Sequence, residues 1–419
     1  MSTTTLLIAL YLTRFAAACL LRYLNLRHLR RCGCTVPQGF EDAVDAEALA
    51  KSASYTLAQS RLALVDSVYD SALLIIFMFT PLLPLYDHWI ASLTDSFVLR
   101  GVLFMLVLTL VQEVLDIPFS LYSTFRLERR YGFNTTTPGL WISDFLKSTL
   151  VSAALTAIVI SAALLLVRHS PALWWLWVWA FFAIFSIVMI YVSPYLIEPL
   201  FSKFEPLGDP DLEEEIRGML QKADLRVKDV QQMDASRRSL HSNAYFTGIG
   251  RVKRIVLYDT LLKQMERPEV LAILAHEAGH WKKGHIWKRL ALMEASALAL
   301  FYLVHQVIAW GGLPQLFGLP EASFLAQILM VSFIFSIVSF PLTPVGAWLS
   351  RRNEWEADRF AASLSGTPEA LASALVKLSK ENLANLHPHP FYAAFYYSHP
   401  PVVDRVAVLR SMKVEQTSG

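Results

Sequence analysis

The strongest constraint on this chain is a set of long apolar runs without a single charged residue. Four runs have this property, at residues 148–167, 171–197, 295–320 and 322–350. A helix of about 20 apolar residues spans the hydrocarbon core of a bilayer, where every backbone amide must bond within its own segment. The four runs therefore predict a helical protein that crosses a membrane several times.

The composition of the whole chain agrees with a membrane setting. Of its 419 residues, 54% are hydrophobic and 17% are charged, whereas soluble domains carry about 25% charged residues. This balance excludes a disordered chain, a coiled coil and an ordinary cytosolic enzyme. The formal net charge of +2 gives no electrostatic reason to expect a nucleic-acid partner. Three cysteines cannot build a disulfide framework, and we interpret them as free thiols.

Three further, less clean runs bring the expected number of membrane spans to seven. Residues 4–21 contain Arg14, residues 70–85 are short and begin at Asp70, and residues 97–115 contain Arg100 and Glu113. A cleaved signal peptide is the alternative for the first run, but no positive charge precedes it and Arg14 interrupts it, so a retained helix is favoured. Basic residues follow the first, third and seventh runs. By the positive-inside rule, the C-terminus is expected in the cytoplasm and the N-terminus outside.

The spans divide the chain into four parts. Residues 1–197 would hold spans one to five, with cytoplasmic loops at 22–66 and 116–147. Residues 198–294 would form a catalytic insert, residues 295–350 spans six and seven, and residues 351–419 a helical tail. Within the insert, residues 211–223 predict an amphipathic helix. Short strands are predicted at 227–233, 243–247 and 254–258, with Gly248 and Gly250 in the turn between the last two.

The insert contains the most informative motif, His276-Glu277-Ala278-Gly279-His280. On a helix, His276 and His280 project from one face about a turn apart, which suits two nitrogen ligands of a tetrahedral zinc ion. Glu277 leans toward the same ion without ligating it, as a general base must. His285 follows five residues after His280, and on a continuous helix it would point elsewhere, so we predict an interfacial residue there.

A catalytic zinc needs a third protein ligand, and the segment after the last span offers one. Glu354 and Asp358 lie four residues apart, so Glu354 can ligate while Asp358 orients a ligand histidine. Glu356 points to a different face of the helix. The histidine pair precedes span six and Glu354 follows span seven, so the hairpin of these two spans returns both segments to one side of the membrane.

Several longer segments resemble the type I CAAX prenyl endopeptidase family, in the same order. They are residues 117–125 with Glu128 and 132–134, residues 194–206, Ser242-Asn243-Ala244-Tyr245-Phe246, residues 253–261 and Tyr397-Ser398-His399-Pro400-Pro401. The resemblance runs along most of the chain, and the expected member is of a bacterial type. One departure is Asp404, where the family pattern has glutamate.

The resemblance implies an all-α membrane protein whose seven transmembrane helices form an α-barrel around a chamber. A zinc-peptidase domain with a small β-sheet would close the cytoplasmic end. Family ligands map onto His276, His280 and Glu354, and the base onto Glu277, with one Zn²⁺ per chain. Asn243 and His399 match positions near the metal that hold substrate or the oxyanion. Arg405 is a further polar candidate for the oxyanion.

The expected substrate is a peptide or protein, which the resemblance implies to be C-terminally prenylated. It would lie along the Asn243, Ala244, Tyr245 and Phe246 strand, whose free edge can pair with a peptide backbone. A heat-shock-type quality-control metallopeptidase, with about four spans in that family, is the alternative within the enzyme class. A transporter or scaffold with a structural zinc is the alternative outside it. With no retention signal at its C-terminus, the chain is placed in a bacterial inner membrane rather than the endoplasmic reticulum.

Overall fold

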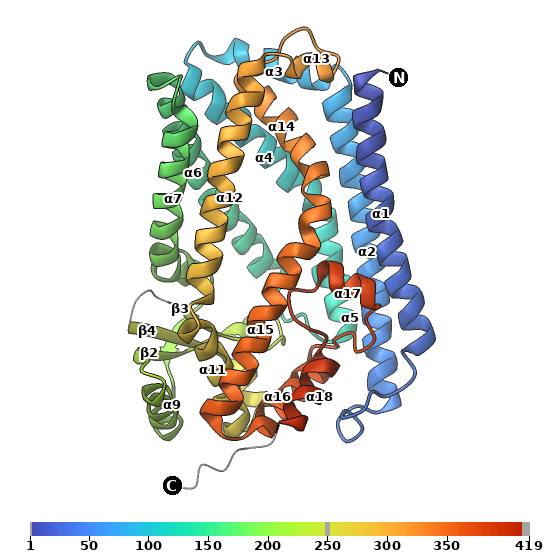
Figure 1. Cartoon of the computed structure of the whole chain (residues 1–419), viewed down its shortest axis with the longest axis vertical. Helices are drawn as coiled ribbons and strands as arrows, with labels where there is room; N and C mark the ends of the chain where they lie inside the picture. Colours follow the sequence, from blue (N-terminus) through green and yellow to red (C-terminus); the bar gives the residue numbers. More distant parts are fainter. Residues whose placement is uncertain (1, 248–251, 413–419) are drawn as a thin grey trace.

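The computed structural model describes residues 2–247 and 252–412 as a mostly helical molecule with one small sheet (Figure 1). The first half contains α1 (Thr3–Cys32), α2 (Ala46–Phe79), α3 (Leu82–Leu93), α4 (Phe97–Tyr122), α5 (Arg129–Tyr131), α6 (Pro138–His169), α7 (Trp174–Val192) and α8 (Glu198–Phe201). The second half contains α9 (Pro210–Lys222), α10 (Asp259–Gln264), α11 (Arg267–Lys282), α12 (His285–Trp310), α13 (Leu313–Leu316), α14 (Phe324–Val338), α15 (Thr343–Ser365), α16 (Pro368–Glu381), α17 (Pro390–Tyr396) and α18 (Val402–Ser411). The predicted turn at Gly248 and Gly250 lies outside the described residues.

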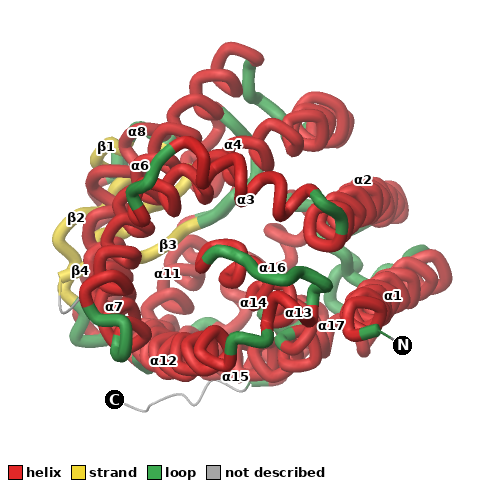
Figure 2. The backbone as a smooth tube through the Cα atoms, turned by 90° about the horizontal axis from the view of Figure 1, so that it is seen from above, coloured by secondary structure: helices red, strands yellow, loops and turns green. Residues whose placement is uncertain are grey.

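Among the described residues, six helices are long and apolar enough to cross a membrane, and a seventh span results if α14 and α15 are counted together. These two helices are bent by 44° at a short break. Seen from above, the long helices α1, α2, α4, α6, α7 and α12 stand in a ring (Figure 2). The chain is therefore a multi-pass membrane protein, and the ring agrees with the predicted barrel.

The helices extend well beyond the apolar runs that predict them. The segment 22–66, expected as a polar and mostly helical loop, is helical for most of its length, because α1 continues to Cys32 and α2 begins at Ala46. The predicted span at 70–85 is wrong at its end, since α2 stops at Phe79 and α3 is a separate helix. Charged residues mark where a helix leaves the hydrocarbon, but they do not terminate the helix itself.

The sheet lies at the end of the molecule that also holds α9, α16 and α18 (Figure 1). Its strands are β1 (Phe204–Pro206), β2 (Arg226–Met233), β3 (Ala244–Thr247) and β4 (Val252–Tyr258), in the order β1-β2-β4-β3. β4 pairs parallel with β2 and antiparallel with β3. The predicted strands agree closely with β2, β3 and β4, whereas the three-residue β1 was not expected. β3 is an edge strand, as the substrate-pairing hypothesis requires.

A buried core connects this sheet to the helices that carry the predicted ligands. Ile255 and Leu257 of β4, Leu274 and Ala275 of α11 and Ala361 of α15 belong to it, and none of them is exposed to solvent. Helix α11 is consequently buried on nearly every side. Its first turn is held by a capping box, in which Glu266 and Glu269 each bond the backbone of the other.

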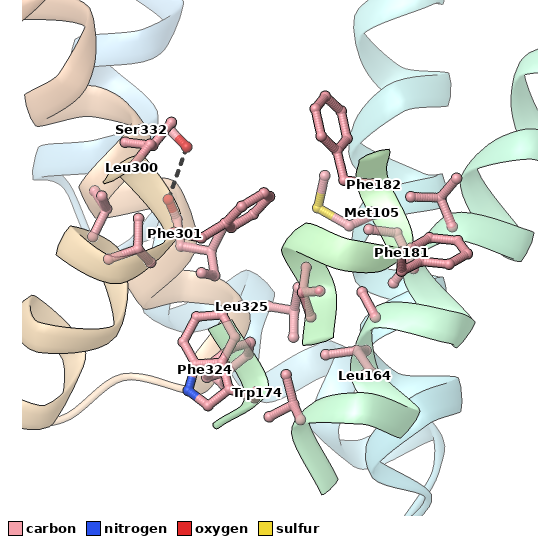
Figure 3. A pocket seen from close by; sticks show the side chains of 18 of the residues that line it. Met105, Leu164, Trp174, Phe181, Phe182, Leu300, Phe301, Phe324, Leu325 and Ser332 are labelled. Carbon is pink, nitrogen blue, oxygen red and sulfur yellow. Dashed lines mark hydrogen bonds between the residues drawn. The ribbon is translucent and has the colours of Figure 1, made fainter. Parts of the chain in front are cut away.

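An apolar cavity of about 320 Å³ lies within the membrane-spanning part, between α4, α6, α7, α12 and α14 (Figure 3). Phe182, Phe301, Leu325 and Trp174 line it, and its one hydroxyl residue, Ser332, donates to the Ile328 carbonyl. Leu300 lies 15 residues after the start of α12, or about 22 Å along the helix axis. This cavity is thus separate from the predicted metal ligands.

Candidate metal centre

The two motif histidines lie on the last two turns of α11 and face each other. Their Nε2 atoms are 3.2 Å apart, and the ring centroids are 4.9 Å apart. His276 is buried, with 7% of its surface exposed. The tight approach of α11 to α15 brings this face against the third predicted ligand. It depends on Gly279, where an added Cβ would lie only 3.0 Å from Ala357 Cα.

Glu354 of α15 reaches both imidazoles. Its Oε2 lies 3.4 Å from His276 Nε2, and its Oε1 lies 3.3 Å from His280 Nε2. The ligand atoms of His276, His280 and Glu354 all lie within 4.8 Å of one another, and theirs is the only such group of potential metal ligands among the described residues. The residues predicted from two distant motifs therefore meet at one point.

The geometry of these three side chains fits a tetrahedral ion. Ligand atoms at 2.0–2.1 Å from such an ion would be about 3.3 Å apart. The two Nε2 atoms are 3.2 Å apart, and each lies 3.3–3.4 Å from an oxygen of Glu354, Oε2 for His276 and Oε1 for His280. Glu354 Oε2 is buried and accepts no hydrogen bond, and Arg405 Nη1 lies 3.8 Å from it, so a bound cation would offset the cost of burying this carboxylate. Two imidazoles and one carboxylate, with a fourth position left over, are the usual ligand set of a catalytic site.

Asp358 lies behind His276. Its Oδ1 is 2.8 Å from His276 Nδ1, so Nδ1 carries a proton and Nε2 is the ring nitrogen left for a metal ion. Asp358 is completely buried. Burial lowers the pKa of the His276 imidazole, but the carboxylates of Asp358 and Glu354 outweigh it and raise the pKa to about 9, so a metal ion would take the place of a proton on Nε2.

Arg405 of α18 lies against the carboxylates of Asp358 and Glu354. Its Nε and Nη2 donate to the two Asp358 oxygens at 2.8 and 2.6 Å, and its Nη1 lies 3.8 Å from Glu354 Oε2. The guanidinium is almost fully buried. Because its donors already serve carboxylates, this geometry favours a positioning role over the predicted role in binding substrate or the oxyanion.

The predicted base and the predicted oxyanion donors lie around the ligands. Glu277 follows His276 on α11, and burial raises the pKa of its carboxyl. His399 Nε2 lies 3.5 Å from Glu354 Oε1, while 61% of its side chain remains exposed. Partial desolvation lowers the pKa of His399, although the Glu354 carboxylate acts in the opposite direction. Asn243 is exposed immediately before β3, and its Oδ1 accepts from the Ala244 amide.

β3 places the predicted substrate strand beside α11. Ala244 and Phe246 are buried, whereas Tyr245 is partly exposed. The Tyr245 hydroxyl donates to Glu198 at 2.8 Å, and burial together with this carboxylate raises the pKa of the phenol. One edge of β3 pairs with β4, and the other has no strand partner among the described residues.

The prediction that His285 is an interfacial residue pointing elsewhere is wrong. His285 is buried, and its Nδ1 lies 3.0 Å from His280 Nδ1. Its Nε2 lies 3.2 Å from Glu356 Oε2. The prediction assumed one continuous helix. Gly284 instead adopts a left-handed conformation with φ +67° and separates α11 from α12. A glycine between two histidines was the sequence signal for this contact.

Comparisons with known proteins agree with this site and fold. Residues 25–203 match the family model described as CAAX prenyl protease N-terminal, five membrane helices, and residues 206–413 match the model of peptidase family M48. The five-helix description favours this family over a four-span heat-shock-type peptidase. The peptidase match also argues against a transporter or scaffold.

Relatives and a solved structure cover nearly the whole chain. CAAX prenyl protease 1 homolog of Arabidopsis thaliana is 34% identical over 404 residues, 92% of this chain and 93% of that protein. CAAX prenyl protease 1 of Saccharomyces cerevisiae is 31% identical, covering 92% of this chain and 91% of that one. The crystal structure of S. mikatae Ste24p superposes with a TM-score of 0.90 at 28% identity, covering 98% and 99% of the two chains. The chain therefore belongs to the CAAX prenyl protease 1 family of M48 membrane metalloendopeptidases.

Proposed function

We propose that this chain is a zinc endopeptidase that removes the C-terminal tripeptide of prenylated proteins. The single observation that carries the metal assignment is the convergence of His276, His280 and Glu354 beside Glu277. Two imidazoles and a carboxylate are the ligand set of zinc peptidases. The substrate class is supported by the relatives, whose names describe CAAX prenyl proteases.

The reaction uses the residues around this centre in distinct roles. When bound, zinc supplies Lewis acidity that polarises the scissile carbonyl and activates water. Glu277 takes the proton of the attacking water and returns it to the leaving amine. We propose His399 and Asn243 as donors of hydrogen bonds to the developing oxyanion, and loss of one such donor costs about 2.7–4 kcal/mol of transition-state stabilisation.

The substrate is proposed to lie along the free edge of β3. A peptide in an extended conformation adds its backbone hydrogen bonds to the edge of a sheet. Residues Ala244–Thr247 form that edge, and β3 lies directly beside the helix of the ligand histidines. The partly exposed Tyr245 then lies on the surface that neighbours the substrate, whereas Phe246 packs in the buried core.

The orientation and location of the protein complete the proposal. The N-terminus and the metal-binding end lie at opposite ends of the molecule (Figure 1), and the basic loops favour a cytoplasmic metal centre. We place the chain in a bacterial inner membrane, with the spans within residues 1–197 and 295–350 embedded and the loops 22–66 and 116–147 on the cytoplasmic side. Residues 198–294 and 351–419 together form the catalytic part.

Glu277→Gln tests the catalytic assignment. The variant is expected to retain metal and fold but to lose peptide hydrolysis, because glutamine cannot accept the water proton. Glu214→Gln, an exposed change on α9, is the matched control and should remain active. Hydrolysis by Glu277→Gln at the rate of the control would remove Glu277 as base.

The substrate class is tested separately by mapping cleavage sites with mass spectrometry on matched prenylated and unprenylated peptides. Release of the last three residues from the prenylated peptide is the expected result. Equal cleavage of both peptides would refute the requirement for prenylation, and the assignment as an endopeptidase would stand.

A further inference from the structure

The two ligand histidines are supported in different ways. His276 contacts the Asp358 carboxylate directly through Nδ1, whereas the Nδ1 of His280 faces another imidazole, that of His285. Glu356 then lies beyond His285. Asp358 and Glu356 both come from α15, the helix that also carries the ligand Glu354. One helix thus supplies a carboxylate to the ion and one to the support of each histidine.

The contacts between Glu356, His285 and His280 determine which ring nitrogen of each histidine carries the proton. A carboxylate can only accept, so His285 must donate to Glu356 Oε2 from Nε2, over 3.2 Å. A neutral His285 then has a lone pair on Nδ1, which accepts from His280 Nδ1 over 3.0 Å. With its proton on Nδ1, His280 presents the Nε2 lone pair to His276 and Glu354, where a metal ligand must have it.

The local fold holds these contacts in place. His280 belongs to the last turn of α11, and His285 is the first residue of α12, across the left-handed Gly284. The His285 side chain is only 4% exposed, whereas 32% of Glu356 is exposed beside Arg352. This series of contacts thus begins at the partly exposed carboxylate of Glu356 and ends at the metal-facing side of His280.

We propose that His285 and Glu356 form a hydrogen-bond relay that sets the tautomer and orientation of His280 and so strengthens retention of the metal. This inference rests on the proposed metal centre and adds two positioning residues to it. Groups that support a ligand histidine in this way typically contribute 10–100-fold to metal affinity. Neither residue needs to contact substrate.

The test measures metal affinity rather than turnover. Purified full-length protein is stripped with a chelator and titrated with Zn²⁺ against a competing chromophoric chelator. His285→Gln and Glu356→Gln are each expected to weaken zinc binding about 10–100-fold. The controls Glu214→Gln and His88→Gln, the latter on α3 at the opposite end of the molecule, should bind zinc as the unmodified chain does.

Two further measurements separate a relay from a merely structural contact. The double variant His285→Gln with Glu356→Gln should bind zinc about as tightly as the single variant that binds it more weakly, because both changes interrupt the same series of hydrogen bonds. The melting temperatures of the metal-free single variants should match that of the unmodified metal-free chain. Additive losses, or lower metal-free melting temperatures that account for the weaker binding, would overturn the relay.

The outcomes also distinguish this inference from the proposed function. Zinc affinities of both single variants within twofold of the unmodified chain would refute the relay and leave the peptidase intact. Failure of the unmodified chain to bind zinc at all would refute both. Loss of hydrolysis in Glu277→Gln with retained zinc supports the peptidase alone and does not bear on the relay.

Discussion

Asp358→Asn is the substitution whose effect on stability can be worked out most directly. Asp358 accepts two hydrogen bonds from Arg405, at 2.8 and 2.6 Å, and lies 2.8 Å from His276 Nδ1. Asparagine keeps the size of the side chain but removes its charge. The buried Arg405 then keeps Glu354, at 3.8 Å, and Glu277 as its counter-charges. Breaking one side of a buried ion pair costs about 3–5 kcal/mol.

The same helix offers a matched control for this substitution. Arg410 of α18 forms a comparable forked pair with Glu369, at 2.9–3.1 Å, but the two side chains are 37% and 63% exposed. Solvent screens that pair, so Glu369→Gln is expected to cost about 0–1 kcal/mol. The free energy of unfolding of the metal-free variants, measured by denaturant titration in detergent, compares the two.

A double-mutant cycle isolates the buried pair. Asp358→Asn combined with Arg405→Gln should cost less than the sum of the two single changes, because neither then leaves an isolated buried charge. The reasoning fails if Asp358→Asn and Glu369→Gln destabilise the protein equally, or if the changes at Asp358 and Arg405 are simply additive.

Three other predictions concern the surroundings of the centre. Gly279→Ala should separate α11 from α15 by a few tenths of an ångström, since the new Cβ would meet the Ala357 backbone; zinc affinity should fall while helix content by circular dichroism is kept, and unchanged affinity would contradict the close approach. Burial raises the pKa of Glu269, but hydrogen bonds from Lys377 and Ser373 outweigh it and lower the pKa. The Glu269 carboxylate therefore stabilises the fold above its unfolded pKa of about 4.3, and this contribution disappears as pH falls through the lower folded value; Glu269→Gln should flatten the unfolding free energy between pH 5 and pH 3, whereas the exposed Glu214→Gln should not. Chelation should abolish peptide hydrolysis and zinc should restore it, and persistent activity in metal-free protein would refute the metal mechanism.

The meeting of His276, His280 and Glu354 could be predicted from the sequence because two rules sufficed, one on helical spacing and one on membrane topology. Helical spacing placed the histidines on one face, and a hairpin of two spans returned Glu354 to the same side. The structure brings these side chains within reach of one another. Asp358 was predictable for the same reason, as the residue one turn beyond Glu354.

Long-range and conformational details were not predictable in this way. The contact of His285 with His280 depends on the left-handed backbone of Gly284, which helical spacing does not reveal. The pairing of Arg405 with Asp358 joins segments 47 residues apart. Hydropathy alone does not locate helix ends, because α1 and α2 continue past the apolar runs into polar sequence.

The bend between α14 and α15 joins the last membrane-spanning segment to the metal centre. Glu354, Glu356 and Asp358 are carried on a rod that continues from the last membrane-embedded segment across a 44° elbow. One stretch of chain therefore crosses the membrane and carries all three carboxylates to the histidines of α11, so the direction set at the elbow determines where α15 meets α11.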